Sequence, residues 1–163
     1  MISEEDYNAY FTVGTALALI CVENYDLDKE FFKYARQLDF DEKEILKDEI
    51  IYCRIALVLA RLKNFNNSQA EKILFEQFFN CIRKNLSAYD FNNLNNKLDE
   101  YCDISISDNT LKIILNNADI SEKNFKITDF IALKFFIKSD FKKYLDYTER
   151  MTEILKSPAN KCS

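Results

Sequence analysis

The sequence predicts an all-α fold: a single-domain bundle of about seven to eight helices. Apolar residues recur with a period near 3.6 along most of the chain, as helices with one buried face require. The 163 residues include only one glycine and one proline. β-Hairpins and phosphate-binding loops usually need glycine, so neither is expected here. Hydrophobic residues make up 48% of the chain, which is enough to bury a core in one domain.

The first half of the chain should contain the two central helices of the bundle. One is expected at about 3–23, capped by Ser3, and its segment Val13–Val22 is apolar around most of the circumference. A short helix should follow and end near Leu38. The second central helix is expected at about 41–65, after a break and cap at residues 39–41.

The second half should contribute four or five shorter helices. Ser68 and Glu71 have the spacing of a capping box, in which each side chain bonds the other residue's backbone N–H. Further helices are expected from Asp90, around Leu111–Leu115, and from Ile127. The pair Ser139–Asp140 predicts a cap that begins a separate last helix. The domain is expected to span 1–157, and residues 158–163 to form a flexible tail.

The composition argues against most kinds of chemistry. The chain has no histidine, which excludes Ser-His-Asp and Cys-His nucleophile systems and the helical zinc and di-iron motifs. Its five cysteines form no C-x-x-C pair, and the first four lie in apolar helical patterns, so they are expected to be reduced core residues. We therefore predict a non-enzymatic protein without cofactor or metal, located in the cytoplasm. The acidic N-terminus and the lack of a long apolar run predict neither a signal peptide nor a membrane span.

Two alternative functions remain open, one as an enzyme and one as a nucleic-acid-binding protein. Acidic pairs at i,i+3 spacing, Glu100 with Asp103 and Asp146 with Glu149, could hold magnesium in a carboxylate enzyme, although neither pair has a convincing second motif. Residues 111–127 could form a helix-turn-helix. However, Leu115 stands where a small residue is preferred and Thr128 where a buried one is, which favours an ordinary connection within a bundle.

The charge is unevenly distributed along the chain. The net charge is −5, with −7 in residues 1–60, −1 in 61–120 and +3 in 121–163. A general nucleic-acid binder would carry the opposite overall sign, although the Lys-rich last third leaves a DNA-binding regulator as an alternative. The abundance of Lys, Asn, Ile, Phe and Tyr is typical of an AT-rich source genome and carries no functional signal.

The acidic first third predicts a surface that binds a basic protein. Acids in a helix's first turn favour the helix dipole, which accounts for many of these residues but less well for Asp48 and Glu49. The function predicted is that of an immunity or inhibitor protein, which covers the active site of a basic toxin such as a nuclease. The candidate binding residues are Asp26, Asp28, Glu30, Asp39, Asp41, Glu42, Glu44, Asp48 and Glu49, with Tyr25 and Tyr34 as aromatic anchors.

Overall fold

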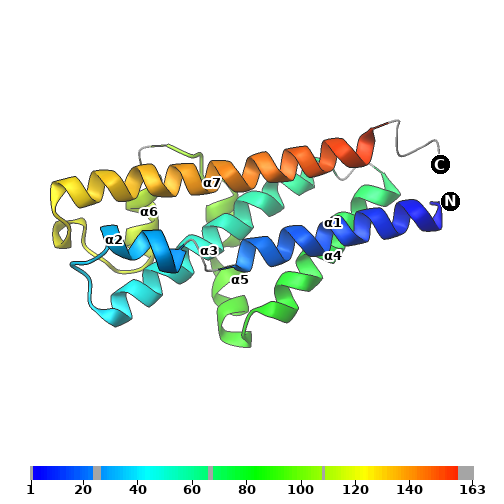
Figure 1. Cartoon of the computed structure of the whole chain (residues 1–163). Helices are drawn as coiled ribbons and strands as arrows, with labels where there is room; N and C mark the ends of the chain where they lie inside the picture. Colours follow the sequence, from blue (N-terminus) through cyan, green and yellow to red (C-terminus); the bar gives the residue numbers. More distant parts are fainter. Residues whose placement is uncertain (1, 24–26, 66–67, 108, 158–163) are drawn as a thin grey trace.

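The protein is an all-helical, single-domain bundle, as the sequence predicts (Figure 1). The computed structural model describes residues 2–23, 27–65, 68–107 and 109–157, apart from the side chain of Asp28. Within these ranges there are seven α-helices and no strand. The helices are α1 (Glu4–Val22), α2 (Phe32–Tyr34), α3 (Phe40–Lys63), α4 (Gln69–Asn85), α5 (Ala88–Cys102), α6 (Thr110–Asn117) and α7 (Ile127–Lys156). A π-helical turn, Leu27–Phe31, precedes α2, and a 3₁₀ turn, Glu122–Asn124, precedes α7.

Side-chain caps fix where several helices begin. The Ser68–Glu71 capping box is present as predicted: Glu71 N donates to Ser68 Oγ at 3.2 Å, and Ser68 N donates to Glu71 Oε2 at 2.9 Å. Asp39 and Glu42 form a second capping box at the start of α3. Helix α5 begins earlier than the expected Asp90, because Ser87 is its cap and accepts from Asp90 N at 3.1 Å.

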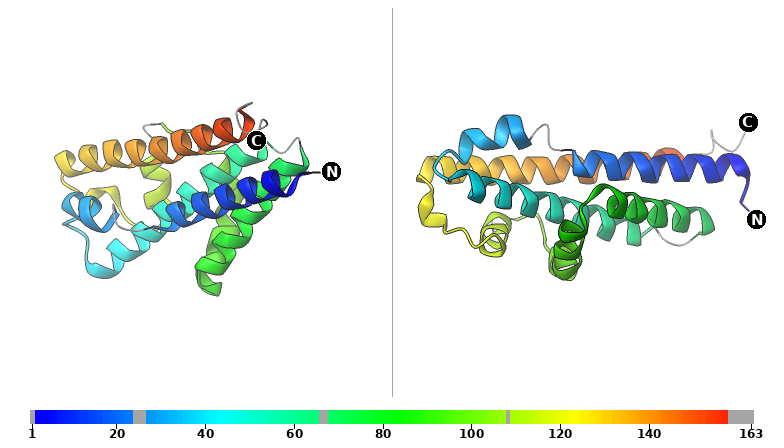
Figure 2. Two further views of the ribbon diagram at one scale, coloured as in Figure 1. Left: turned by 45° about the vertical axis from the view of Figure 1, so that its right-hand side comes forward. Right: turned by 90° about the horizontal axis from the view of Figure 1, so that it is seen from below.

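Helix α3 is the centre of the bundle, which confirms the prediction for residues 41–65. It contacts α1, α4, α5, α6 and α7 (Figure 2). Every residue from Glu49 to Leu59 is buried. An uninterrupted buried run of this kind is expected of a helix that is surrounded by other helices.

Helix α1 differs from the expectation of a second central helix. It buries one stripe, Gly14, Leu17, Ala18 and Cys21, mainly against α4. Its other side is open, and Leu19 is 47% exposed. A Cβ atom added at Gly14 would lie 2.8 Å from the Leu74 carbonyl oxygen, so the absence of a side chain there permits the close approach of α1 to α4.

Helix α7 corrects the prediction of two separate helices divided at Ser139–Asp140. It is one continuous helix of 30 residues that runs along most of the molecule (Figure 1). Asp140 caps nothing: it is 6% exposed and its carboxylate accepts hydrogen bonds from Arg54. The ion pair with Arg54 therefore accounts for Asp140, which would otherwise favour the start of a helix.

The buried Arg54 joins three helices. Its Nε and one terminal nitrogen donate to Asp140 Oδ2 at 3.1 and 2.8 Å. The other terminal nitrogen donates to the carbonyl oxygens of Cys21 and Glu23, both at 3.1 Å, at the end of α1. The guanidinium lies 4.1 Å from the centre of the Tyr144 ring. The charge is therefore paired and hydrogen-bonded on every side, as burial demands.

The predictions about the cysteines, the C-terminal tail, the second helix and membrane spans have different outcomes. Cys21, Cys53 and Cys81 are buried and Cys102 is half-buried, and all four are free thiols. Cys162 and the predicted tail 158–163 lie outside the described residues. The short second helix ends at Tyr34 instead of Leu38, although Leu38 is still buried. In the described part of the chain, no helix has the length and apolar character that a bilayer span requires.

Candidate acidic binding surface

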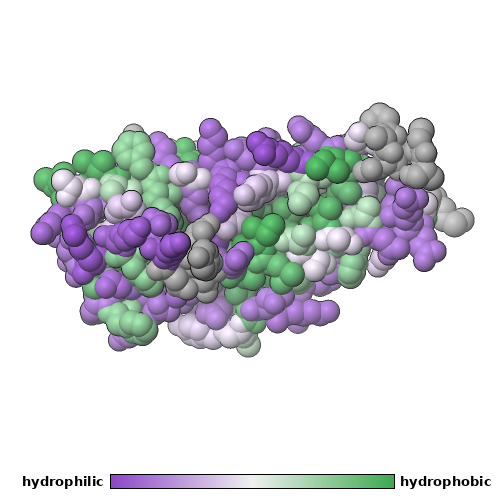
Figure 3. Space-filling model, viewed as in Figure 1, coloured by the Kyte–Doolittle hydropathy of each residue, from purple (hydrophilic) through white to green (hydrophobic). Residues whose placement is uncertain are grey.

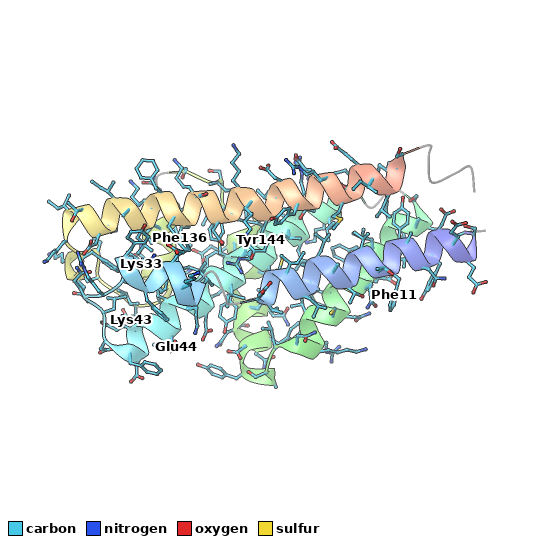
Figure 4. All side chains as sticks on the ribbon, viewed as in Figure 1. Phe11, Lys33, Lys43, Glu44, Phe136 and Tyr144 are labelled. Atoms are coloured by element: carbon cyan, nitrogen blue, oxygen red, sulfur yellow. The ribbon has the colours of Figure 1, made fainter. Side chains whose placement is uncertain are left out.

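One face of α3 carries a row of acidic residues with exposed apolar side chains among them. Asp41, Glu44, Ile45 and Asp48 follow the i, i+3, i+4, i+7 spacing that places residues on one side of a helix. Ile45 is 47% exposed, and Phe40, which begins the helix, is 74% exposed. We call these five residues the acidic face. It lies at the end of the molecule where α2 and the start of α3 meet, near the Glu44 label in Figure 4.

The acidic face ends in a cleft between α3 and the turn that joins α4 to α5. The cleft has a volume of about 250 Å³. It is lined by Val22, Asp48, Ile51, Tyr52, Asn85, Leu86, Ser87 and Asp90. Two carboxyl groups from different helices thus border one hollow, next to three apolar side chains and the polar groups of Tyr52, Asn85 and Ser87.

Asp90 is held in place by hydrogen bonds from two neighbours. Tyr52 Oη donates to Asp90 Oδ1 at 2.8 Å, and the Ser87 hydroxyl donates to Asp90 Oδ2. Burial, and then the hydrogen bond to Asp90, raise the pKa of the Tyr52 hydroxyl above its usual range. Tyr52 therefore stays protonated and remains a hydrogen-bond donor to Asp90.

Asp48 has an altered acidity because of its place in the cleft. Burial, followed by the charge of Asp90, raises the pKa of the Asp48 carboxyl to about 6. Glu44 and Glu49 act in the same direction, and Lys47 opposes them. A positive group that enters the cleft would relieve this repulsion, so the site is suited electrostatically to a cation such as an arginine or lysine side chain.

Several predicted binding residues have local roles at the same end of the molecule. Asp39 and Glu42 form the capping box of α3, and Glu42 Oε1 also accepts from Asn124 at 3.4 Å. Glu44 pairs with Lys47 at 2.8 Å, and Glu30 pairs with Lys33 at 3.0 Å. The acidic residues at 39 and 42 therefore serve to start helix α3. Glu30 belongs to an i,i+3 pair on the surface, and Glu44 to an i,i+3 pair with the buried Lys47.

Glu49 requires a correction, because it does not belong to an exposed acidic patch. It is 3% exposed, and its carboxylate bonds Lys97 and the Tyr101 hydroxyl of α5. Successive residues on a helix point about 100° apart, so Asp48 can face the cleft while Glu49 faces α5. Glu49 therefore joins α3 to α5 and is not available to a partner.

The predicted tyrosine anchors receive little support from the structure. Tyr34 is half-buried, and its ring centre lies 6.3 Å from that of Phe136 on α7. Tyr25 and Asp26 lie outside the described residues, as does the side chain of Asp28. On the acidic face, Phe40 and Ile45 are the apolar side chains that a partner can reach.

The carboxylate pairs considered for magnesium have partners of other kinds. Glu100 accepts a hydrogen bond from Asn117 at 3.1 Å, and Glu149 pairs with Arg61. Asp103 is the C-cap residue of α5. Among the residues that the structure describes, no group of three or more Cys, Asp or Glu side chains is arranged to hold a metal ion.

The connection between α6 and α7 is unlike a helix-turn-helix. Residues 118–126 separate the two helices and include the 3₁₀ turn at Glu122–Asn124. This is longer than the three- or four-residue turn of the DNA-binding motif. Ile120 and Phe125 are buried and anchor the connection to the core, as expected of an ordinary connection in a bundle.

The cleft residues Tyr52 and Asp90 were not among the predicted site residues. Tyr52 lies in an apolar run that indicates only a core position, and Asp90 resembles a helix-initiating residue. The spacing of Asp41, Glu44 and Asp48 could have indicated a common face, and Tyr52 continues the row by one turn. The contact between Tyr52 and Asp90 depends on how α5 packs against α3. The sequence near either residue does not indicate that packing.

Comparison with known proteins gives no relative: the chain matches no family model, no curated protein and no solved structure.

Proposed function

We propose that the protein is a non-enzymatic binding protein that uses the acidic face and its cleft to hold a basic protein. The observation that carries the proposal is the cleft, where Asp48 and Asp90 face one hollow and burial and mutual repulsion raise the pKa of Asp48. An arginine or lysine of the partner would enter there. Phe40 and Ile45 would supply the apolar contacts that dominate binding energy in protein interfaces.

The specific form of this proposal is an immunity or inhibitor protein for a basic toxin such as a nuclease. A nuclease active site presents positive charge to phosphate groups, and a row of carboxylates on a rigid helix can take their place. Binding would then cover the active site without any reaction. The proposal places the protein in the cytoplasm, where its free thiols stay reduced.

The test is to co-express the tagged protein with the product of the adjacent gene and to measure whether they co-purify in equal amounts. If they do, the double variant Asp41→Lys, Asp48→Lys should slow association at least about tenfold at low salt. The matched control is Glu76→Lys, Asp99→Lys, which changes the net charge equally at exposed positions of α4 and α5. No complex, or equal loss in both double variants, would count against the acidic face.

A second candidate function is supported by the lysines of α7. Lys126 is the N-cap residue of α7, and Lys134, Lys138, Lys142 and Lys143 lie within the first 17 residues of this helix. The two acids in the same segment, Asp129 and Asp140, are buried. This surface would suit the phosphates of DNA in a regulatory protein. Duplex binding that weakens steeply with salt, and is lost on Lys134→Glu with Lys138→Glu, would favour this function over the first.

A further inference from the structure

The exposed side of α7 carries a row of apolar side chains near the start of the helix. Ile127, Ile131 and Phe135 are four residues apart, so they lie along one side of the helix over about 12 Å. Their exposed fractions are 80%, 48% and 69%. We call these three residues the apolar row. Figure 3 shows hydrophobic side chains at the outer edge of the molecule where α7 begins.

The packing of α7 in the bundle keeps the apolar row on the outside. Phe136 faces the bundle, where its ring centre lies 6.5 Å from that of Phe31 and 6.3 Å from that of Tyr34. Phe135 comes one position earlier, and a step of about 100° around the helix turns its side chain away from these rings. The row therefore belongs to a rigid element of the core and not to a loop.

Lysines lie directly beside the apolar row. Lys134 and Lys138 line a hollow of about 150 Å³ together with Ile131 and Phe135. The aliphatic parts of the two lysines thus border the same hollow as the apolar side chains, and their ammonium groups can extend beyond them. Lys142 follows one helical turn after Lys138 and is exposed.

The acids in this part of α7 do not offset the lysines at the surface. Up to Asp146 the helix contains two acids, Asp129 and Asp140, which are 7% and 6% exposed. Glu122, which precedes the helix, forms an ion pair with Lys112 at 3.6 Å. The outward side of this part of α7 therefore combines apolar side chains with positive charge.

We propose that the apolar row and its lysines bind the anionic surface of a lipid membrane, with α7 parallel to that surface. The side chains of the apolar row would enter the boundary between head groups and acyl chains. Lysine ammonium groups would remain at the level of the negatively charged head groups. Isoleucine and phenylalanine next to lysine on one helix are typical of helices that lie in a membrane interface.

The apolar row favours this partner over two other anionic ones. The lysines of α7 also suit the phosphates of DNA, but a phosphate backbone offers no apolar contact to isoleucine or phenylalanine. Three side chains of this size supply roughly 500 Å² of apolar area, less than the ~800 Å² that each partner buries in a stable protein interface. A membrane needs neither a matching groove nor a minimum area, because the charges of several lysines add to the apolar contact.

This inference is independent of the function proposed for the acidic face and competes only with DNA binding by the same lysines. Glu44, which belongs to the acidic face, lies below α3 in Figure 4, whereas α7 forms the opposite edge of the molecule. A chain bound to a membrane through α7 would therefore keep its acidic face open to a basic protein. Binding to vesicles and co-purification with the adjacent gene product can each fail without the other.

The experiment is flotation of the purified full-length chain with vesicles of phosphatidylserine and phosphatidylcholine in equal amounts. Vesicles of phosphatidylcholine alone should bind at least about tenfold more weakly. Ile127→Ser with Phe135→Ser should weaken binding to the mixed vesicles at least about tenfold, because both changes remove apolar surface that enters the lipid. The matched control is Leu19→Ser with Tyr89→Ser, at positions 47% and 75% exposed on α1 and α5, and it should bind like the wild type.

A second pair of changes tests the charges separately. Lys134→Gln with Lys138→Gln keeps the apolar row and should weaken binding to the mixed vesicles about tenfold. Circular dichroism should show the same helicity in all variants.

The proposal would be overturned if the chain did not float with the mixed vesicles, or if both serine double variants lost binding equally. Undiminished binding of the Ile127→Ser, Phe135→Ser variant would also overturn it, since the lysines alone would then make the contact. Duplex DNA binding that is unchanged in this variant, without any binding to vesicles, would assign the lysines of α7 to nucleic acid instead.

Discussion

Arg54 and Asp140 form a fully buried ion pair that connects the middle of α3 to the middle of α7. The closest contact is 2.8 Å, and the two side chains are 0% and 4% exposed. The same guanidinium also binds the last carbonyls of α1 and lies against Tyr144. One side chain therefore connects the three longest helices.

Removal of either member of this pair should destabilise the protein strongly. Asp140→Ala leaves the guanidinium buried without its counter-ion, and Arg54→Ala leaves the carboxylate alone. Each should lower the free energy of unfolding by about 3–5 kcal/mol. The double variant Arg54→Met, Asp140→Leu should lose less than the sum of the two, because no charge remains buried. Urea denaturation measures all three, and simple additivity would contradict the coupling.

Asp48 should make stability depend on pH in a direction opposite to that of most carboxyl groups. Its pKa is raised from 3.8 to about 6 in the folded state, so the folded protein binds the extra proton between these values. Stability is then lost as the pH rises from about 4 to 6, and the full penalty is present at pH 7. Since Asp48 is partly exposed, we expect Asp48→Asn to stabilise by about 1–2 kcal/mol at pH 7.

The measurement is thermal unfolding of wild type and Asp48→Asn at pH 4, 5, 6 and 7. The difference in melting temperature should vanish near pH 4 and grow toward pH 7. Asp99→Asn, at an exposed position on α5, is the control and should behave like wild type. If Asp48→Asn raised the melting temperature equally at every pH, the charge of Asp48 would not be the cause of the stabilisation.

Gly14→Ala tests the close approach of α1 to α4. Alanine normally favours a helix by about 1 kcal/mol over glycine. Here the new methyl group would lie 2.8 Å from a backbone oxygen of α4, which cannot move without displacing that helix. We therefore expect a net loss of about 1–3 kcal/mol in unfolding free energy by urea titration. Thr12→Ala on the open side of α1 should change stability little, and a stabilised Gly14→Ala would refute the contact.

The sequence predicted the features that depend on local signals. The Ser68–Glu71 capping box lies within four residues, and the apolar run of α3 indicates a helix surrounded by others; both are confirmed. Ser139–Asp140 shows the limit of such signals, since a residue 86 positions away turns an apparent cap into part of an ion pair. Helix α1 is a related case: its apolar segment predicts a helix covered on most sides, but the structure leaves Leu19 47% exposed.

The acidic surface was predicted only in part for a similar reason. Asp48 and Glu49 are adjacent and chemically alike, yet one lines a cleft and the other is buried against α5. Helical geometry predicts that they diverge, but which of them faces inward depends on where α5 packs. Lys97 and Tyr101, the partners of Glu49, lie 48 and 52 residues away along the chain.

The hydrogen bonds from Arg54 to the Cys21 and Glu23 carbonyls affect local unfolding at the end of α1. Helix ends usually fray, and their amide hydrogens exchange with solvent without unfolding of the rest. The end of α1 is instead tied to the buried ion pair, so it can open only when α3 and α7 separate. Amide hydrogens in the last turn of α1 should therefore exchange as slowly as those in the middle of α3, while those in its first turn exchange rapidly.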